Sequence, residues 1–175
     1  MSRNNLDDLD LEIIAELQKD CRTPLQDIAR RVGHPPSTVH YRVKRLEKEK
    51  IIDGYYAKIN PERIGMDYIT VIRIFARYAP EYYNTVGKEL AKVPGVWAVY
   101  YSLGDQDFFV LTRSEDRKDF METLDTIMAI KGVKRTKTQI IARVIEEDPR
   151  IDIKGKIKSG RKKRRKKKTE EDLAE

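Results

Sequence analysis

Apolar residues near the N-terminus recur at helical spacing. Leu6, Leu9, Ile13 and Leu17 are three or four residues apart, which is the stripe of an amphipathic helix. Pro24 can open a second helix that ends at Gly33, with an inner face of Leu25, Ile28, Ala29 and Val32. A third helix follows Pro35-Pro36 and turns Val39, Val43 and Leu46 inward. Three short helices with a tight turn before the last predict a helix-turn-helix domain over residues 1–54.

Residues 55–67 are predicted to connect this domain to a second one. Ile52–Ile59 has the pattern of a short strand, and Asn60-Pro61 starts a turn before Gly65.

Residues 68–148 alternate between strand-like and helix-like patterns. Strands are predicted at Tyr68–Tyr78, Val96–Leu103, Phe108–Thr112 and Val133–Ile145, and helices at Pro80–Val93 and Arg117–Ile130. The order β-α-β-β-α-β is that of a ferredoxin-like domain, so the predicted fold class is α+β. Helices cover one face of such a sheet. In so small a domain we expect a partner subunit on the other face, as in a homodimer or a higher homo-oligomer.

The net charge of +7 belongs entirely to the C-terminal segment 149–175, which holds 12 Lys/Arg and 5 Asp/Glu, while the other 148 residues are neutral in sum. Such a charge block is expected to be a disordered tail. It is expected to bind duplex DNA without sequence preference through eight consecutive cations: Arg161, Lys162, Lys163, Arg164, Arg165, Lys166, Lys167 and Lys168. RNA, a ribosome, a protein partner or a mere gain in solubility are the alternatives.

Charge is also segregated within the helix-turn-helix domain. Between Ile28 and Leu46 there are five basic residues and no acidic ones, whereas Asp7 to Asp20 holds six acidic residues and one lysine. The second helix of such a motif enters the major groove of DNA. Thr38, His40 and Tyr41 are therefore expected at base edges, and Arg42, Lys44 and Arg45 at phosphates, with Ser37 also outward. The alternative is an ordinary helical hairpin with a solvated charged face.

Two segments of the sequence resemble the two domains of a known protein family. Residues 6–65 are similar to the N-terminal domain of the Lrp/AsnC, or feast/famine, regulators, and the match runs through Leu9-Asp10, Ile13-Ile14, Ile28-Ala29, Val32-Gly33, Ser37-Thr38-Val39, Arg42-Val43, Arg45-Leu46-Glu47, Gly54-Tyr55 and Asn60-Pro61. The following segment resembles the family's ligand-sensing domain through Gly104-x-x-Asp107 and Thr136-x-Thr138. Two features depart from the family pattern: Pro35, where a small hydroxyl residue is usual, and the tail beyond residue 149.

The resemblance implies that an amino acid or related small molecule binds between dimers near Gly104 and Asp107 and changes the assembly. Thr136 and Thr138 lie two apart on a strand, so both point to one face and offer hydroxyls to such an effector. The alternatives stay open: Gly and Asp also suit a tight hairpin, and threonine is common in strands.

The sequence therefore predicts a DNA-binding transcription regulator modulated by an amino acid-like effector. An architectural DNA-binding protein is the first alternative, and the second is a haem-pathway decarboxylase, a group that shares this two-domain architecture. Because no catalytic motif is present, we expect that the protein is not an enzyme. Two histidines and one cysteine form no ligand cluster, so we expect neither a cofactor nor a metal. With no signal peptide, no apolar span and the single Cys21, the expected location is the cytoplasm. The abundance of Lys, Arg and Glu resembles that of thermophile or archaeal proteins.

Overall fold

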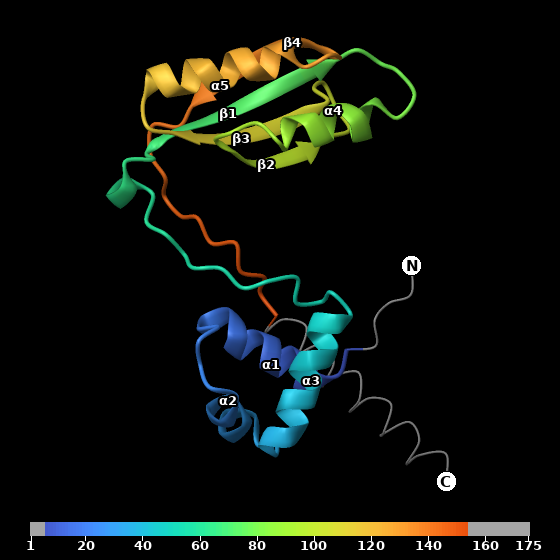
Figure 1. Ribbon diagram of the computed structural model, residues 1–175, viewed down its shortest axis with the longest axis vertical. Helices are drawn as coiled ribbons and strands as arrows, with labels where there is room; N and C mark the ends of the chain where they lie inside the picture. Colours follow the sequence, from blue (N-terminus) through green and yellow to red (C-terminus); the bar gives the residue numbers. More distant parts are fainter. Residues whose placement is uncertain (1–5, 154–175) are drawn as a thin grey trace, which may run out of the picture. The chain divides into compact units, whose positions relative to one another are not determined.

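The computed structural model describes residues 6–153, which belong to two compact units (Figure 1). The first unit comprises the chain up to Ala57 together with the C-terminal segment from Asp148, and the second comprises Lys58–Glu147.

The first unit contains the three predicted helices. They are α1 (Asp8–Lys19), α2 (Leu25–Val32) and α3 (Pro36–Lys48). Each places its apolar stripe in one core, formed by Ile13, Leu17, Ile28, Ala29, Val39, Val43 and Leu46. Gly33 ends α2 in the left-handed conformation (φ 71°), which a residue without a Cβ adopts without strain and which lets the chain turn directly into α3.

The predicted strand at Ile52–Ile59 is wrong, because the structure has no strand between α3 and Tyr68. A short 3₁₀ helix, η1 (Glu62–Ile64), is the only regular element there. Tyr55, Tyr56 and Ile59 are exposed. A strand needs a neighbour to pair its backbone groups, and in the described part of this single chain no strand lies beside the segment.

The second unit has the predicted β-α-β-β-α-β order. Its elements are β1 (Tyr68–Ala76), α4 (Tyr82–Leu90), β2 (Val96–Tyr101), β3 (Phe108–Ser114), α5 (Arg117–Ala129) and β4 (Val133–Ile140). The strands form one antiparallel sheet in the order β2-β3-β1-β4, so β1 and β3 are central and β2 and β4 are edges.

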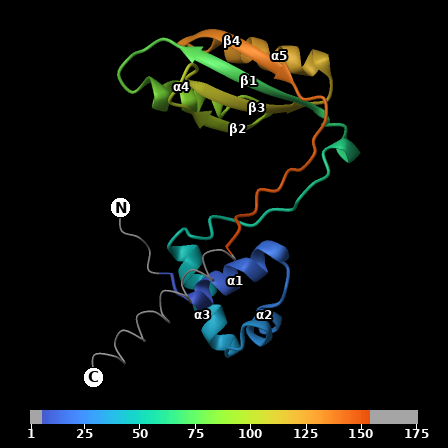
Figure 2. The same cartoon turned by 180° about the vertical axis from the view of Figure 1, so that it is seen from behind.

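Helices cover one face of this sheet and not the other. Figure 2 shows the sheet with its helices α4 and α5. Ile72 and Ile74 of β1 and Phe108 and Val110 of β3 point to the face that carries these helices, where they pack with Val86, Leu90, Phe120 and Ile127. Alternation places Val71, Arg73 and Phe75 on the opposite face, beside Leu111 and Phe109. No described helix of this unit lies on that second face, which we call the open face of the sheet.

The C-terminal segment was predicted to be a disordered tail from residue 149. Its first residues, up to Ile153, are instead placed in the first unit, where Ile153 is buried. The eight-cation run at 161–168 lies outside the described residues.

Candidate DNA interface and effector site

Helix α3 presents most of the predicted recognition residues to solvent. Val39, Val43 and Leu46 are buried in the core, so the opposite side of the helix is free. Ser37, His40, Tyr41 and Lys44 lie on that side and are exposed, and the side chain of Thr38 is half-buried. Tyr41 is 66% exposed, so its ring and hydroxyl are accessible to another molecule.

The N-terminus of α3 is open to an acceptor. Pro35 is the N-cap and Pro36 the first helical residue, so no side chain caps this end, as expected from the departure at Pro35. The first turn has no acidic residue. The N–H groups of Ser37 and Thr38 lie beyond the reach of intrahelical bonding. Together with the positive end of the helix dipole, they can receive a phosphate or a base-edge acceptor.

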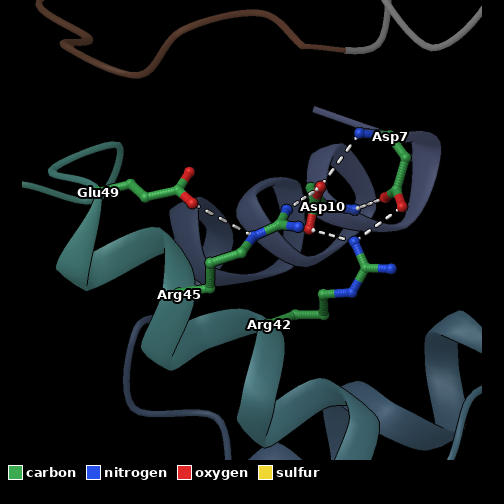
Figure 3. A network of polar contacts seen from close by, with 5 residues as sticks. All are labelled: Asp7, Asp10, Arg42, Arg45 and Glu49. Carbon is green, nitrogen blue, oxygen red and sulfur yellow. Dashed lines mark hydrogen bonds and ion pairs between the residues drawn. The ribbon is translucent and has the colours of Figure 1, made fainter. Parts of the chain in front are cut away.

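The carboxylate of Asp10 ties α1 to α3 (Figure 3). Arg42 Nη1 donates to Asp10 Oδ1 over 3.1 Å and to Asp7 Oδ2 over 2.7 Å, and Arg45 Nη2 donates to Asp10 Oδ2 over 2.5 Å. Asp7 and Asp10 also form a capping box at the start of α1, in which each side chain accepts from the other's backbone N–H. Burial raises the pKa of Asp7, but the Asp10 N–H and the Arg42 guanidinium outweigh it and leave that pKa below its ordinary value.

This network gives two of the predicted DNA-contacting residues partners within the domain. Arg42 and Arg45 were expected to face DNA phosphates, but their side chains are only 23% and 28% exposed and turn toward α1. The physical reason is Asp10, which is fully buried, because burying a carboxylate is costly unless cations or hydrogen-bond donors pair with it. Both arginines therefore hold the recognition helix in place.

The sequence carried a signal for this network. Asp10 falls on the inward stripe of the first helix, three residues before Ile13 and seven before Leu17. A carboxylate on an apolar stripe needs a partner, and the arginines of α3 are the nearby cations.

Fewer cations remain for DNA than the sequence count suggested. Lys44 is 66% exposed and pairs only with Glu47 of its own helix, over 3.3 Å. Arg31 donates to Glu16 of α1 over 2.8 Å, and Arg30 pairs with Asp27. All three side chains are half-exposed or more, so phosphates can compete with these surface pairs.

In the second unit, both carboxylate oxygens of Asp107 have partners within the chain. The backbone N–H of Ala76 donates to Oδ2 over 2.7 Å, and the Tyr82 hydroxyl donates to Oδ1 over 2.7 Å. The backbone N–H of Asp107 also donates to Ile74 O. The residue predicted to bind an effector thus also fastens the β2–β3 turn to the end of β1 and the start of α4.

Gly104 is exposed and has no positive φ, so the turn does not require a glycine for its backbone conformation. A Cβ there would meet only Ser102 Oγ, at 3.9 Å. What glycine provides at this position is an unobstructed backbone.

Thr136 lies toward the same end of the sheet as this turn but two strands away, and Thr138 lies two residues further along β4, opposite Ile72 in the middle of β1. Phe108, which follows Asp107, pairs with Ile74, and Ile74 pairs with Thr136, so two strand spacings of about 5 Å each separate them. Thr136 is half-buried and Thr138 is exposed. The structure therefore gathers Gly104, Asp107 and Thr136 along one edge of the domain, without direct contact between the turn and the threonines.

Sequence reasoning missed the tyrosines beside Asp107. The hydroxyls of Tyr82 and Tyr101 lie 3.3 Å apart, and the ring of Tyr101 is 5.5 Å from that of Tyr83. Hydrogen bonds to Tyr101 and Asp107 raise the pKa of Tyr82, which therefore stays a neutral donor to the carboxylate. Tyr82 is 25 residues from Asp107 in the sequence, and no local pattern links them.

The comparisons with known proteins agree with this geometry. The family model for winged helix-turn-helix DNA-binding domains matches residues 6–53, and that for the Lrp/AsnC ligand-binding domain matches residues 70–151. The HTH-type transcriptional regulator FL11 of Pyrococcus furiosus is 35% identical over 152 residues, which cover 87% of this chain and 99% of the relative. The chain belongs to the Lrp/AsnC family.

Other Lrp/AsnC relatives extend the comparison. The leucine-responsive regulatory protein of Salmonella typhimurium is 30% identical over 86% of this chain and 93% of its own length. A transcriptional regulator from Neisseria meningitidis, solved as its L-Met complex, is 25% identical, with a TM-score of 0.77 over 85% of this chain and 97% of that one. A feast or famine regulatory protein of M. tuberculosis, complexed with L-methionine, is 29% identical, with a TM-score of 0.75 over 83% and 98%. The chain is thus an HTH-type transcription regulator with the family's two domains.

The described part of the chain lacks two features that other functions would use. Residues 6–153 contain no group of three or more His, Cys, Asp or Glu side chains arranged to hold a metal ion. None of the helices described here is long and apolar enough to cross a membrane.

Proposed function

We propose that this Lrp/AsnC regulator reads a specific duplex sequence through Ser37, Thr38, His40 and Tyr41 of α3. The observation that carries the proposal is the exposed side of α3, where an uncapped helix end, an imidazole and an exposed phenol lie together. Lys44 supplies a phosphate contact beside them. Arg42 and Arg45 act from the inside, since they fix the orientation of α3 against Asp10.

We propose an amino acid or a related small molecule as the effector, bound between subunits at Gly104, Asp107, Thr136 and Thr138. L-methionine in two related structures supports this class of ligand. An ionised carboxylate has about four acceptor positions, and Ala76 and Tyr82 use two at Asp107, so an ammonium group can still bind. No catalytic role is proposed for these residues, and the relatives are regulators.

The proposed assembly is a homodimer, or a multiple of it, formed through the open face of the sheet. This face carries half-buried apolar residues, Val71, Phe75 and Leu111 among them. It also carries buried Arg73 Nε and Arg113 Nη1, which have no hydrogen-bond partner among the described residues. Unsatisfied buried donors and an uncovered apolar face are both accounted for by a second subunit. Leu111→Asp is expected to yield monomers by light scattering, and Met121→Asp on the exposed side of α5 is the matched control.

Selection of bound sequences from random duplex DNA, with and without pooled amino acids, tests DNA recognition. His40→Ala and Tyr41→Ala are expected to lose about 1–3 kcal/mol at particular base pairs of the selected site. Equal losses on all sequences would contradict base recognition and favour the architectural alternative. Failure to enrich any sequence would do the same. The expected place of action is the cytoplasm, where the DNA is.

A matched pair of variants tests the effector site. DNA binding and light scattering are measured across the twenty amino acids. Asp107→Ala is expected to lose the response. Tyr82→Phe, which loses one of the two internal hydrogen bonds of Asp107 but keeps the carboxylate, is expected to retain it. Loss of the response in both variants would mean that Asp107 acts only through the fold. No response of the unmodified protein to any amino acid would limit this domain to dimerisation.

A further inference from the structure

The two edges of the sheet in the second unit differ in charge. The edge strand β4 carries Lys134, Arg135 and Lys137, whereas residues 93–104, which include all of β2, contain no charged side chain. Tyr100 of β2 is nevertheless 57% exposed. Edge strands of soluble domains commonly carry lysines or other charges that keep them from pairing with another strand. The edge at β4 is protected in this way, and the edge at β2 is not.

The outer edge of β2 has backbone groups available for pairing. The Ser102 N–H donates to Asp107 O over 2.8 Å, so alternation directs the backbone groups of Tyr100 toward β3 as well. The N–H and C=O groups of Val99 and Tyr101 therefore point away from β3. Among the described residues, no strand pairs with β2 on that side. An additional strand could take up these donors and acceptors.

The chain around β2 is complementary to itself in the antiparallel direction. Lys92 lies four residues before the first residue of β2, and Asp105 lies four residues after the last. Antiparallel pairing of two β2 strands brings the basic end of each toward the acidic end of the other, whereas parallel pairing brings like charges together. Lys92 pairs with Glu89, but both side chains are more than half exposed, so a second carboxylate can compete. A second copy of this chain therefore fits the edge.

One register uses only the regular part of the strand. The pairing of β2 with β3 shifts between Val96 and Ala98, so the regular part of β2 runs from Ala98 to Tyr101. With Tyr100 on a two-fold axis, Val99 of each copy lies opposite Tyr101 of the other, and each such pair exchanges both of its hydrogen bonds. The side chains then form β-branched–aromatic pairs and one tyrosine pair, which are types that stabilise antiparallel sheets.

We propose that the β2 edges of two copies pair antiparallel and join two four-stranded sheets into one continuous sheet. The proposal rests on the proposed assembly, because it joins homodimers formed through the open face into larger assemblies. Each homodimer carries two β2 edges, so an assembly is held at several such contacts, while a single contact between monomers is weak. The turn from Gly104 to Asp107 follows β2, which places the proposed effector site beside the second copy.

Sedimentation velocity of the full-length protein, without DNA or amino acids, tests the edge contact. Val99→Pro removes an N–H that points away from β3, so it removes one bond from each Val99–Tyr101 pair and leaves the pairing with β3 in place. The dissociation constant between homodimers is expected to rise roughly thirty-fold. Homodimers should then predominate at concentrations where the unmodified protein forms larger assemblies.

A proline on the other edge of the sheet is the matched control. The Ile141 N–H donates to Ile69 O over 2.9 Å, so the N–H of Ile140 points away from β1. Ile140→Pro therefore removes an outward N–H from β4, as Val99→Pro does from β2. It is expected to sediment like the unmodified protein. If Val99→Pro does not fold, as judged by circular dichroism and Trp97 fluorescence, an exchange of charges decides.

The charge exchange tests which ends of the strands meet. Lys92→Asp and Asp105→Lys each place like charges together at both ends of the contact, and each is expected to weaken the assembly roughly five-fold. The double variant restores opposite charges and is expected to recover the wild-type size. The two residues flank opposite ends of β2, at least about 15 Å apart within one chain, so recovery reports a contact between copies.

Unmodified protein that sediments only as a homodimer would overturn the proposal and leave the β2 edge to a strand of another protein. Wild-type assembly in folded Val99→Pro would also overturn it, as would a double charge variant that stays as weak as the single ones. Dimers in Leu111→Asp that become monomers on addition of Val99→Pro would instead contradict the open-face homodimer and support the edge contact.

Discussion

In each unit one aspartate links separate elements near the candidate site, but the two aspartates have different kinds of partner. Asp10 in the first unit is fully buried and faces two guanidinium groups, from Arg42 and Arg45. Asp107 in the second unit is partly buried and accepts from two neutral donors, the Ala76 N–H and the Tyr82 hydroxyl. The first carboxylate has its charge neutralised within the protein. The second has two neutral donors as its partners, and the proposed effector role of Asp107 rests on this contrast.

Removal of Asp10 should have the largest effect on stability. Asp10→Ala removes the buried carboxylate that Arg42 and Arg45 share and leaves them with the more exposed Asp7 and Glu49. It is expected to cost about 2–3 kcal/mol in the free energy of unfolding. The figure is set below the range for deep pairs because both arginines are about a quarter exposed and can turn to water. Urea denaturation measures it. A cost under about 0.5 kcal/mol, as for a surface residue, would show that the network does not hold α3.

Removal of Asp107 should cost less, because its partners are neutral. Asp107→Ala leaves the Ala76 N–H and the Tyr82 hydroxyl without their acceptor, for an expected loss of about 1–2 kcal/mol. Tyr82→Phe removes one of the two bonds and should cost about half as much. Urea unfolding followed by the fluorescence of Trp97, which lies in β2 of the same unit, gives both values. Equal costs for Asp10→Ala and Asp107→Ala would remove the distinction between charged and neutral partners.

Substitution of two neighbouring cations of α3, Lys44 and Arg45, should distinguish a residue that contacts DNA from one that positions the helix. Lys44→Ala is expected to reduce the slope of log affinity against log salt by about 0.9, the value for one phosphate contact, with little change in stability. Arg45→Ala should do the reverse, since it lowers stability through Asp10. Binding isotherms at several salt concentrations, paired with urea curves, test this. A reduced salt slope in Arg45→Ala at wild-type stability would restore Arg45 to the DNA surface.

Acid should weaken the first unit before the second. Ion pairs with Lys19 and Arg31 lower the pKa of Glu16 below its ordinary 4.5, and that of Asp7 lies below 3.8. Groups with lowered pKa values stabilise the fold fully above the unfolded values and lose that contribution as pH falls through the folded ones. Both of these carboxylates belong to the first unit.

An acid titration with two probes measures the difference. Below about pH 4 the helical circular dichroism, to which α1, α2 and α3 contribute most, is expected to fall while Trp97 fluorescence stays native. Glu16→Gln should make the helical signal less dependent on pH. A simultaneous change of both probes would indicate that the two units unfold together.

The sequence by itself determined the elements of both domains. Helical stripes such as Leu9, Ile13 and Leu17, the turn at Gly33 and the strand–helix alternation after Tyr68 are local patterns, and local patterns reflect the backbone periods of 3.6 and 2 residues. The exposure of His40, Tyr41 and Lys44 followed from the same periodicity, because the buried side of one helix defines its free side. The family resemblance of residues 6–65 was visible for the same reason.

Only the tertiary structure decided which polar side chains were already engaged. Arg42 and Arg45 pair with Asp10, which is more than thirty residues away, and Asp107 pairs with Ala76 at the end of β1 and with Tyr82 of α4. The expected strand at Ile52–Ile59 failed on the same ground, since strand formation depends on a neighbouring strand. Gln18 and Ile151 meet across 133 residues. Periodicity shows which way a side chain points from its own helix or strand, but its partner is set by the packing of segments that the chain order does not bring together.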